Sequence, residues 1–229
     1  MKKINNPWLT TVKSTTTKTK EFLSHLSIRV RTNQYGLFIK LIKPKTNDLI
    51  LDVGASSLEG YQDSNMFEKL YSYPQNLTAA TIEDNKVLKK LYPKIHTVQI
   101  KPGKKLPFKK NQFDIVTSWA TIEHVGDEES QRFFLSELSR VGKKVFLTTP
   151  YKYCIYEPHS GIFFLHWLPD KWFRYILSFL GKSFWVREDN LHPVGLTDVH
   201  KIFPDIDFQV KVYRTFGLLP SHLIIFRNN

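Results

Sequence analysis

The sequence is poor in cysteine, in acidic residues and in uninterrupted apolar runs. Its single cysteine, Cys154, excludes an internal disulfide framework and a zinc cluster built on Cys-x-x-Cys pairs, and it favours a reducing compartment. The first residues are polar and rich in Thr and Lys where a secretory signal needs an apolar core, so no export signal is expected. The longest apolar region, residues 161–181, is interrupted by His166, Asp170 and Arg174 and cannot span a bilayer as written.

What the chain does contain is basic and aromatic. Its 229 residues, 41% of them hydrophobic and 14% aromatic, suffice for one domain with a full core and exclude wholesale disorder. The net charge of +12 favours anionic partners, such as a phosphate-bearing substrate, an anionic membrane surface or nucleic acid. The alternative is that the charge only keeps the protein in solution.

Short apolar segments alternate with helical patterns along the chain, which predicts a parallel sheet with helices on both faces. Each strand segment is bounded by polar or turn residues, as buried parallel strands are. The five segments are 48–53, 77–82, 95–100, 113–118 and 144–148. Two later segments, 208–213 and 222–227, are joined by too short a turn for a helix, so we expect them to pair antiparallel.

Capping residues predict where helices begin and end. Asp84 or Asn85 caps one helix, and Asp127 begins another that ends at Gly142. Apolar spacing predicts a helix near residues 66–71 as well. The positions expected to be buried in the Asp127 helix are Phe134, Leu138 and Val141.

We interpret residues 1–229 as a single domain with four parts. Residues 1–35 form a loose N-terminal arm that can turn helical near Glu21-Phe22-Leu23, residues 36–150 the core, residues 151–205 an aromatic-rich insertion, and residues 206–229 the closing strands. A short segment over residues 35–42 is expected to pack on the core. Within the insertion, a helix over 169–181 is expected to carry one apolar stripe, made of Trp172, Phe173, Ile176, Leu177 and Leu180. Its neighbouring Lys and Arg residues are typical of a helix at a membrane interface.

The first strand runs into a turn of small residues, Gly54-Ala55-Ser56-Ser57. Such a turn lets backbone N–H groups approach a ligand at the carboxyl end of the strand, although the same pattern occurs in proteins without a ligand. Glu83 follows the second strand, where an ionised carboxylate can accept hydrogen bonds from both hydroxyls of a ribose. The alternative is an acid favoured by the helix dipole, with Asp84 as the cap.

The segment 106–125 is the most specific of the sequence. It contains Leu106-Pro107-Phe108, Phe113-Asp114-Ile115-Val116 and Glu123-His124-Val125. With the turn and the strand pattern, it resembles the class I S-adenosylmethionine-dependent methyltransferases, and in particular the type 11, ubiquinone/menaquinone-biosynthesis-like branch. The resemblance covers about residues 48–150. It implies an α/β, Rossmann-like seven-stranded sheet, mostly parallel with an antiparallel C-terminal strand, and S-adenosyl-L-methionine as the cofactor.

Carried over by position, the resemblance implies that Asp52, Gly54 and Ala55 line the methionine end of the cofactor and that Glu83 holds the ribose. The further cofactor contacts that it implies are Ser56, Asp84, Gly103, Lys104, Ser118 and Trp119. The chain departs from the family at two places. Ser56-Ser57 stands where a second glycine is usual, and Pro102 stands where an acid commonly contacts the adenine.

Methyl transfer from a sulfonium is an in-line displacement, for which the protein supplies mainly alignment. Where the acceptor must lose a proton, His124 and Glu123 lie just past the fourth strand, at the end of the sheet where ligands bind. The alternative is that this pair stabilises the loop. His159, close after Glu157, offers a second acid/His pair in the insertion.

The function that the sequence favours is methyl transfer to an O or N atom of a small-molecule or lipid- or glycan-linked acceptor, in the cytoplasm, with possible peripheral membrane contact. One alternative is a non-catalytic module that keeps the fold. The other is an RNA methyltransferase, suggested by the charge. Ser118-Trp119-Ala120-Thr121 stands where base-modifying N-methyltransferases usually carry an Asp/Asn-Pro-Pro-aromatic motif, which argues against methylation of adenine in DNA and leaves RNA open.

Overall fold

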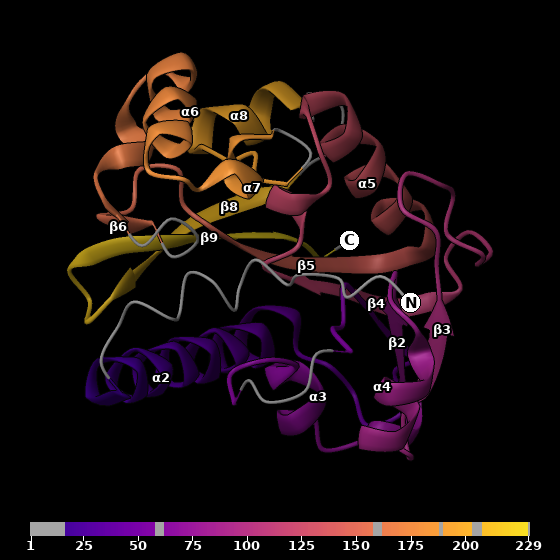
Figure 1. Ribbon diagram of the computed structural model, residues 1–229. Coiled ribbons are helices and arrows are strands. Elements are labelled where there is room, and N and C mark those ends of the chain that lie inside the picture. The colour runs from indigo at the N-terminus through magenta and orange to yellow at the C-terminus, as the bar shows by residue number, and fades with distance from the viewer. Residues whose placement is uncertain (1–16, 58–61, 158–161, 188–189, 203–207, 229) are drawn as a thin grey trace.

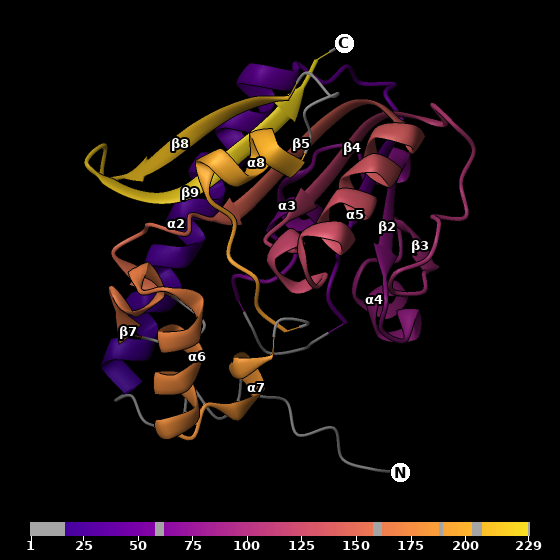
Figure 2. The same cartoon turned by 90° about the horizontal axis from the view of Figure 1, so that it is seen from above.

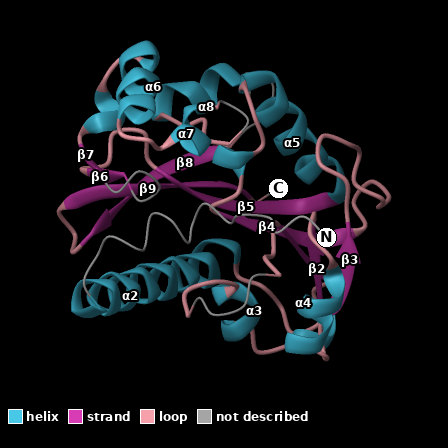
Figure 3. Ribbon diagram, in the orientation of Figure 1, coloured by secondary structure: helices cyan, strands magenta, loops and turns pink. Residues whose placement is uncertain are grey.

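The computed structural model describes residues 17–57, 62–157, 162–187, 190–202 and 208–228. A seven-stranded sheet forms the middle of three layers, with helices above and below it (Figures 1 and 3). The strands are β1 (Ile50–Val53), β2 (Leu77–Thr81), β3 (His96–Gln99), β4 (Phe113–Trp119), β5 (Gly142–Pro150), β8 (Gln209–Thr215) and β9 (Leu219–Arg227). The helices are α2 (Thr17–Ile42), α3 (Met66–Leu70), α4 (Asn85–Leu91), α5 (Glu128–Val141), α6 (Asp170–Phe179), α7 (Ser183–Val186) and α8 (Leu196–Ile202).

The strand order is β3-β2-β1-β4-β5-β9-β8. The first five strands are parallel, and β9 pairs antiparallel with both β5 and β8. This confirms the predicted fold class, the predicted strands to within a few residues, and the antiparallel closing pair. Because the chain runs from β1 outward through β2 and β3 and then returns to β4 on the other side, β1 and β4 flank the point where ligands bind in open α/β sheets.

The two faces of the sheet bury different cores. In Figure 1, α5 and α8 lie above the sheet, and α2, α3 and α4 lie below it. The upper core is mainly aliphatic and includes Leu135, Leu138 and Val141 of α5. As predicted, Asp127 caps α5, accepting from the Ser130 N–H at 2.9 Å. Phe134, expected to be buried, is only partly buried.

Helix α2 corrects the expected loose arm. Within the described residues it runs unbroken through Thr17–Ile42, so the arm of residues 1–35 and the short packing segment after it are one helix from residue 17 onward, and residues 1–16 lie outside the described part. Its buried positions are four residues apart, which places them on one side of the helix. They are Val30, Gln34, Phe38 and Ile42. This stripe is narrow and includes a polar residue, so the sequence shows no broad apolar face.

The insertion packs as a cap beyond the carboxyl end of β5 (Figure 2). Its helix α6 agrees with the prediction and buries Phe173 and Leu177. Trp172 and Leu180 do not join that stripe, since they are 61% and 49% exposed. Within the described residues, no helix has the length and apolar character needed to cross a membrane.

Candidate active site

The turn after β1 requires a glycine at its first position. Gly54 has φ +109°, and a Cβ there would lie 2.1 Å from Thr121 Oγ1. The N–H groups of Gly54 and Ala55 both donate to the Ala80 carbonyl of β2, at 2.9 and 3.2 Å. The turn is therefore anchored to β2 and closed over by the chain that follows β4.

The two serines replace the expected second glycine without backbone strain. Among the described residues of this turn, only Gly54 has a positive φ. The Ser56 N–H donates to Asn65 Oδ1 at 2.9 Å, and Asn65 Nδ2 donates back to the Ser56 carbonyl at 2.8 Å. Asn65, in the left-handed region itself, thus fixes the turn from the start of α3. Sequence reasoning missed it, because Asn65 carries no local sign of this partner.

Glu83 follows β2 and lies beside this turn. Its carboxylate accepts from the Ser57 N–H, and the Ser57 hydroxyl donates to the Asp84 carbonyl at 2.9 Å. A carboxylate has about four lone-pair sites, so Glu83 can also accept from a ribose diol. The N–H groups of the turn already donate within the chain, so the turn offers close approach of its backbone, and Glu83 offers the acceptor that a ribose diol needs. The residues present fit the ribose of S-adenosyl-L-methionine in this way. Asp84 accepts from the Lys86 N–H and caps α4.

Asp52 is buried beneath the turn and faces α3. Thr117 donates to its Oδ1 at 2.6 Å, and its carboxyl group also hydrogen-bonds that of Glu68. Burial, followed by the charge of Glu68, raises the pKa of Asp52 well above its usual value. Burial raises the pKa of Glu68 as well. Two buried carboxyl groups in contact are stable only with a proton between them, and Asp52 links β1 to β4 through Thr117 and to α3 through Glu68.

The remaining cofactor residues implied by the resemblance separate into two groups. Ser118 is buried and its hydroxyl donates to the Val53 carbonyl at 2.7 Å, which ties β4 to the end of β1. Trp119 stacks on Phe67 of α3, with ring centroids 5.5 Å apart, and so belongs to the lower core. Gly103 and Lys104 lie in an exposed turn after β3.

Glu123 and His124 lie together at the carboxyl end of β4. Glu123 is 1% exposed; its Oε2 accepts from Thr149 of β5 at 2.9 Å, and its Oε1 lies 3.9 Å from His124 Nε2. His124 Nδ1 is 2.7 Å from the Asn190 carbonyl. Because a carbonyl only accepts, Nδ1 must carry a proton, and Nε2 of the neutral ring is the basic nitrogen.

The loop that carries Asn190 is held to the same site. The His192 N–H donates to the Glu123 carbonyl at 2.8 Å, and Gln131 Nε2 of α5 donates to the Ile122 and His192 carbonyls. Sequence reasoning found the acid/His pair and missed these supports. Asn190 lies 66 residues from His124 in the chain, while Gln131 is nearby in α5 but carries no local sign of its partners. The second predicted pair cannot be placed, since His159 lies outside the described residues.

A small cavity adjoins Glu123. Its lining includes Tyr151, Cys154, His166 and Leu191 from the insertion and the chain after it. Cys154 Sγ lies 3.4 Å from His166 Nε2, and both residues are buried. The insertion therefore covers the β4 side of the site.

Comparison with known proteins identifies the domain. Residues 51–145 match the family model of a methyltransferase domain, Methyltransf_11. No curated protein sequence matches the chain.

Solved structures of methyltransferases share the fold at low sequence identity. Magnesium protoporphyrin IX methyltransferase from Synechocystis PCC 6803, with bound S-adenosyl-L-homocysteine, is 14% identical at a TM-score of 0.52, covering 90% of this chain and 84% of that one. A putative methyltransferase from Bacillus halodurans is 14% identical at 0.52, covering 83% and 96%. Geranyl diphosphate C-methyltransferase from Streptomyces coelicolor is 12% identical at 0.53, covering 86% and 77%.

The fold is that of the solved S-adenosyl-L-methionine-dependent methyltransferases, and the family-model match assigns it a methyltransferase domain. The chain carries a methyltransferase domain over residues 51–145. The predicted methyltransferase family, enzyme class and cofactor are confirmed, whereas the ubiquinone/menaquinone-biosynthesis-like branch is compatible with these findings but not distinguished by them.

Proposed function

We propose that the protein transfers the methyl group of S-adenosyl-L-methionine to an oxygen or nitrogen atom of a small-molecule or lipid- or glycan-linked acceptor. One observation carries the proposal. Glu83, facing the Gly54 turn, and the Glu123–His124 pair follow β2 and β4, which lie on either side of β1 in the same parallel sheet. A cofactor crevice and a proton acceptor then share one edge of the sheet.

The roles follow from this geometry. The bound cofactor supplies an electrophilic methyl group, and the protein orients it, which is worth up to ~7–11 kcal/mol of the barrier. Glu83 holds the ribose, and the Gly54 turn positions the methionine end. The Asn190 carbonyl keeps the proton of His124 on Nδ1, so that Nε2 accepts the proton of an acceptor hydroxyl or amine. Glu123 stabilises the charged ring that results.

The test begins with cofactor binding. Calorimetry with S-adenosyl-L-methionine is expected to show one site, with Glu83→Gln binding about tenfold or more weakly, because the amide loses one charge-assisted acceptor. Glu129→Gln, an exposed acid in the first turn of α5, is the matched control and should bind like the wild type. A wild type that binds no cofactor contradicts the proposal.

The second measurement concerns the base. With a panel of phenol, carboxylate and amine acceptors, His124→Gln is expected to lose about 10²–10⁴-fold in turnover with phenols and amines, while its affinity for the cofactor is unchanged. If His124 is the base, the turnover of the wild type should fall in acid. The variant should show no such fall. Unchanged turnover would remove His124 from the chemistry.

We further propose that the insertion contacts an anionic membrane surface. Exposed aromatic side chains support this, among them Trp172, Tyr175 and Phe179, which is 83% exposed. Lys171 lies in the first turn of α6 and Lys182 follows the helix, and each basic residue near such a surface contributes ~1 kcal/mol. Sedimentation with vesicles should require anionic lipid and weaken for Trp172→Ser/Phe179→Ser. Binding that is indifferent to lipid charge contradicts this contact.

A further inference from the structure

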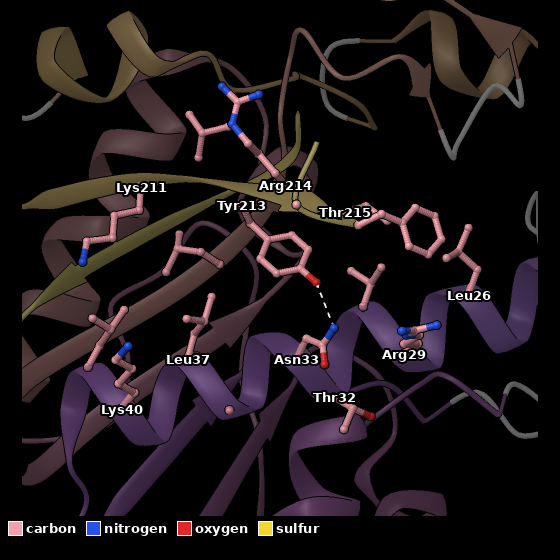
Figure 4. A pocket seen from close by; sticks show the side chains of 17 residues that line it. Leu26, Arg29, Thr32, Asn33, Leu37, Lys40, Lys211, Tyr213, Arg214 and Thr215 are labelled. Carbon is pink, nitrogen blue, oxygen red and sulfur yellow. Dashed lines mark hydrogen bonds between the residues drawn. The ribbon is translucent and has the colours of Figure 1, made fainter. Parts of the chain in front are cut away.

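A groove of about 690 Å³ lies between α2 and the β8–β9 hairpin (Figure 4). Its volume is in the range of ligand pockets. Its walls include the apolar side chains of Val30, Leu37, Leu41 and Ile224. The groove is on the α2 side of the sheet, beneath edge strand β8, whereas the insertion lies on the opposite side (Figure 1). It contains none of the residues assigned to the methyl-transfer site.

The groove is positively charged. Its lining contains Arg29, Lys40, Lys211 and Arg214 and no Asp or Glu. In Figure 4, Lys40 and Lys211 extend from opposite walls at one end, Arg29 lies toward the other end, and Arg214 points away from α2. None of the four forms an ion pair within the described part of the chain. Arg29 lies 5.8 Å from the centroid of the Phe216 ring.

A glycine stands in the wall of this groove. Gly36 lies in the interior of α2, where glycine costs about 1 kcal/mol relative to alanine. Its φ is not positive, and a Cβ there would meet nothing within 4 Å. Packing within the chain therefore does not require glycine at this position. The absence of a side chain keeps the groove open for a close approach to the helix backbone.

We propose that this groove binds a single-chain anionic amphiphile, with its anionic head between Lys40 and Lys211 and its apolar chain along α2. The lining spans α2 from Leu26 to Leu41, about 22 Å at 1.5 Å per residue, which suits an extended alkyl chain. Charge complementarity selects an anionic occupant. The N-terminal residues 1–16 lack the negative charge that this occupant needs, because they contain Lys2, Lys3 and Lys13 and no acid.

The test uses dodecyl phosphate, titrated into the full chain by calorimetry below the concentration at which it forms micelles. We expect one molecule bound per chain. Dodecyl maltoside, with the same chain and a neutral head, should bind at least tenfold more weakly, and inorganic phosphate should bind weakly too. A maltoside that binds as well as the phosphate, or inorganic phosphate that binds as well as dodecyl phosphate, overturns the proposal.

Two sets of variants locate the site. Gly36→Phe fills the groove and is expected to weaken binding at least tenfold, while Gly36→Ala changes it less than threefold. Phenylalanine favours a helix more than glycine does, so the fold should persist. Ile39→Phe, at an exposed position outside the lining, is the matched control for added bulk. The double variant Lys40→Ala/Lys211→Ala should bind dodecyl phosphate about tenfold more weakly, and its affinity for dodecyl maltoside should be unchanged.

Other occupants give distinct results, and each of them contradicts the proposal. Self-association that Gly36→Phe abolishes would assign the groove to a second copy of the chain. Binding to anionic vesicles without binding of monomeric dodecyl phosphate would assign it to a bilayer surface. S-adenosyl-L-methionine affinity should be equal in all these variants, so the outcome is independent of the proposed function.

Discussion

Buried acids on the two faces of the sheet have pKa values shifted in opposite directions. On the α5 face, Glu137 accepts from Arg140 Nε at 2.7 Å and from the Leu106 N–H at 2.8 Å, and the arginine holds the pKa of Glu137 below its usual value. On the α3 face, Asp52 and Glu68 lie against each other in the core, and burial raises the pKa of both.

The difference shows what each acid does for the fold. Arg140 also donates to the Phe108 and Leu106 carbonyls, so the ionised Glu137–Arg140 pair fixes the loop that leads into β4. The Asp52–Glu68 pair can stay buried only by keeping a proton, since two carboxylates this close cannot both ionise. One face thus gains stability from a charge, and the other retains an acid beneath the site at a cost in stability.

The largest expected effect is on the α5 face. Arg140→Leu removes four hydrogen bonds and leaves Glu137, 5% exposed, without its cation. We expect a loss of about 2–3 kcal/mol in the free energy of unfolding at pH 7, measured by denaturant titration. Because the pKa of Glu137 is lowered in the fold, the loss should shrink as pH falls below about 4.5.

Lys143→Leu is the control for this comparison. It breaks the 2.7 Å pair with Asp114, in which the lysine is 58% exposed, and should change stability little. Equal losses for the two variants would mean that burial does not distinguish the pairs.

Two glycines differ in how closely their surroundings are packed, one next to α5 and one in α2 on the other side of the sheet. A Cβ at Gly142, where α5 meets β5, would lie 2.5 Å from Val116 Cγ2 and 3.0 Å from the Lys144 carbonyl. Gly142→Ala should therefore destabilise the protein by about 1–3 kcal/mol. Gly36→Ala, in the open wall of α2, should stabilise it by about 0.5–1 kcal/mol. Thermal unfolding measures both, and shifts of the same sign would contradict the difference in packing.

The fold was predictable where burial dictates sequence. Strands β1, β2 and β4 are almost wholly buried because both faces of the sheet are covered, so apolar residues predominate in them. Asp127 marks the start of α5 by its cap. Helix α2 was not, because its buried stripe is one residue wide and contains Gln34, while Thr and Lys dominate its first turns. This helix is stabilised by its packing against the rest of the fold, and such packing leaves little pattern in the helix's own sequence.

The site divides in the same way. Glu83 and His124 were predictable, since the ends of parallel strands meet at one edge of the sheet. The partners that orient them were not. Asn65 fixes the turn beside Glu83, Thr149 of β5 binds Glu123, and Asn190 binds His124 from 66 residues away. Such single contacts have no periodicity to detect. The same holds for Glu68, whose helix reads as an ordinary short amphipathic segment.

The smallest expected effect tests the proton shared beneath the site. Since the pKa values of Asp52 and Glu68 are raised in the fold, the native state retains a proton that the unfolded chain releases above about pH 4. Stability should therefore fall as pH rises from about 4 toward the raised values. In Glu68→Gln, the amide can donate to an ionised Asp52 without binding a proton, so this dependence should flatten.

We expect Glu68→Gln to be more stable than the wild type by about 1 kcal/mol at pH 8, with a smaller difference at pH 5, in denaturant titrations at both values. Glu129→Gln, which removes an exposed charge from α5, should show no such dependence. If the difference between Glu68→Gln and the wild type instead grows on acidification, both acids are ionised in the fold. Asp52 and Glu68 would then need a compensating partner for their charges, as Glu137 has in Arg140.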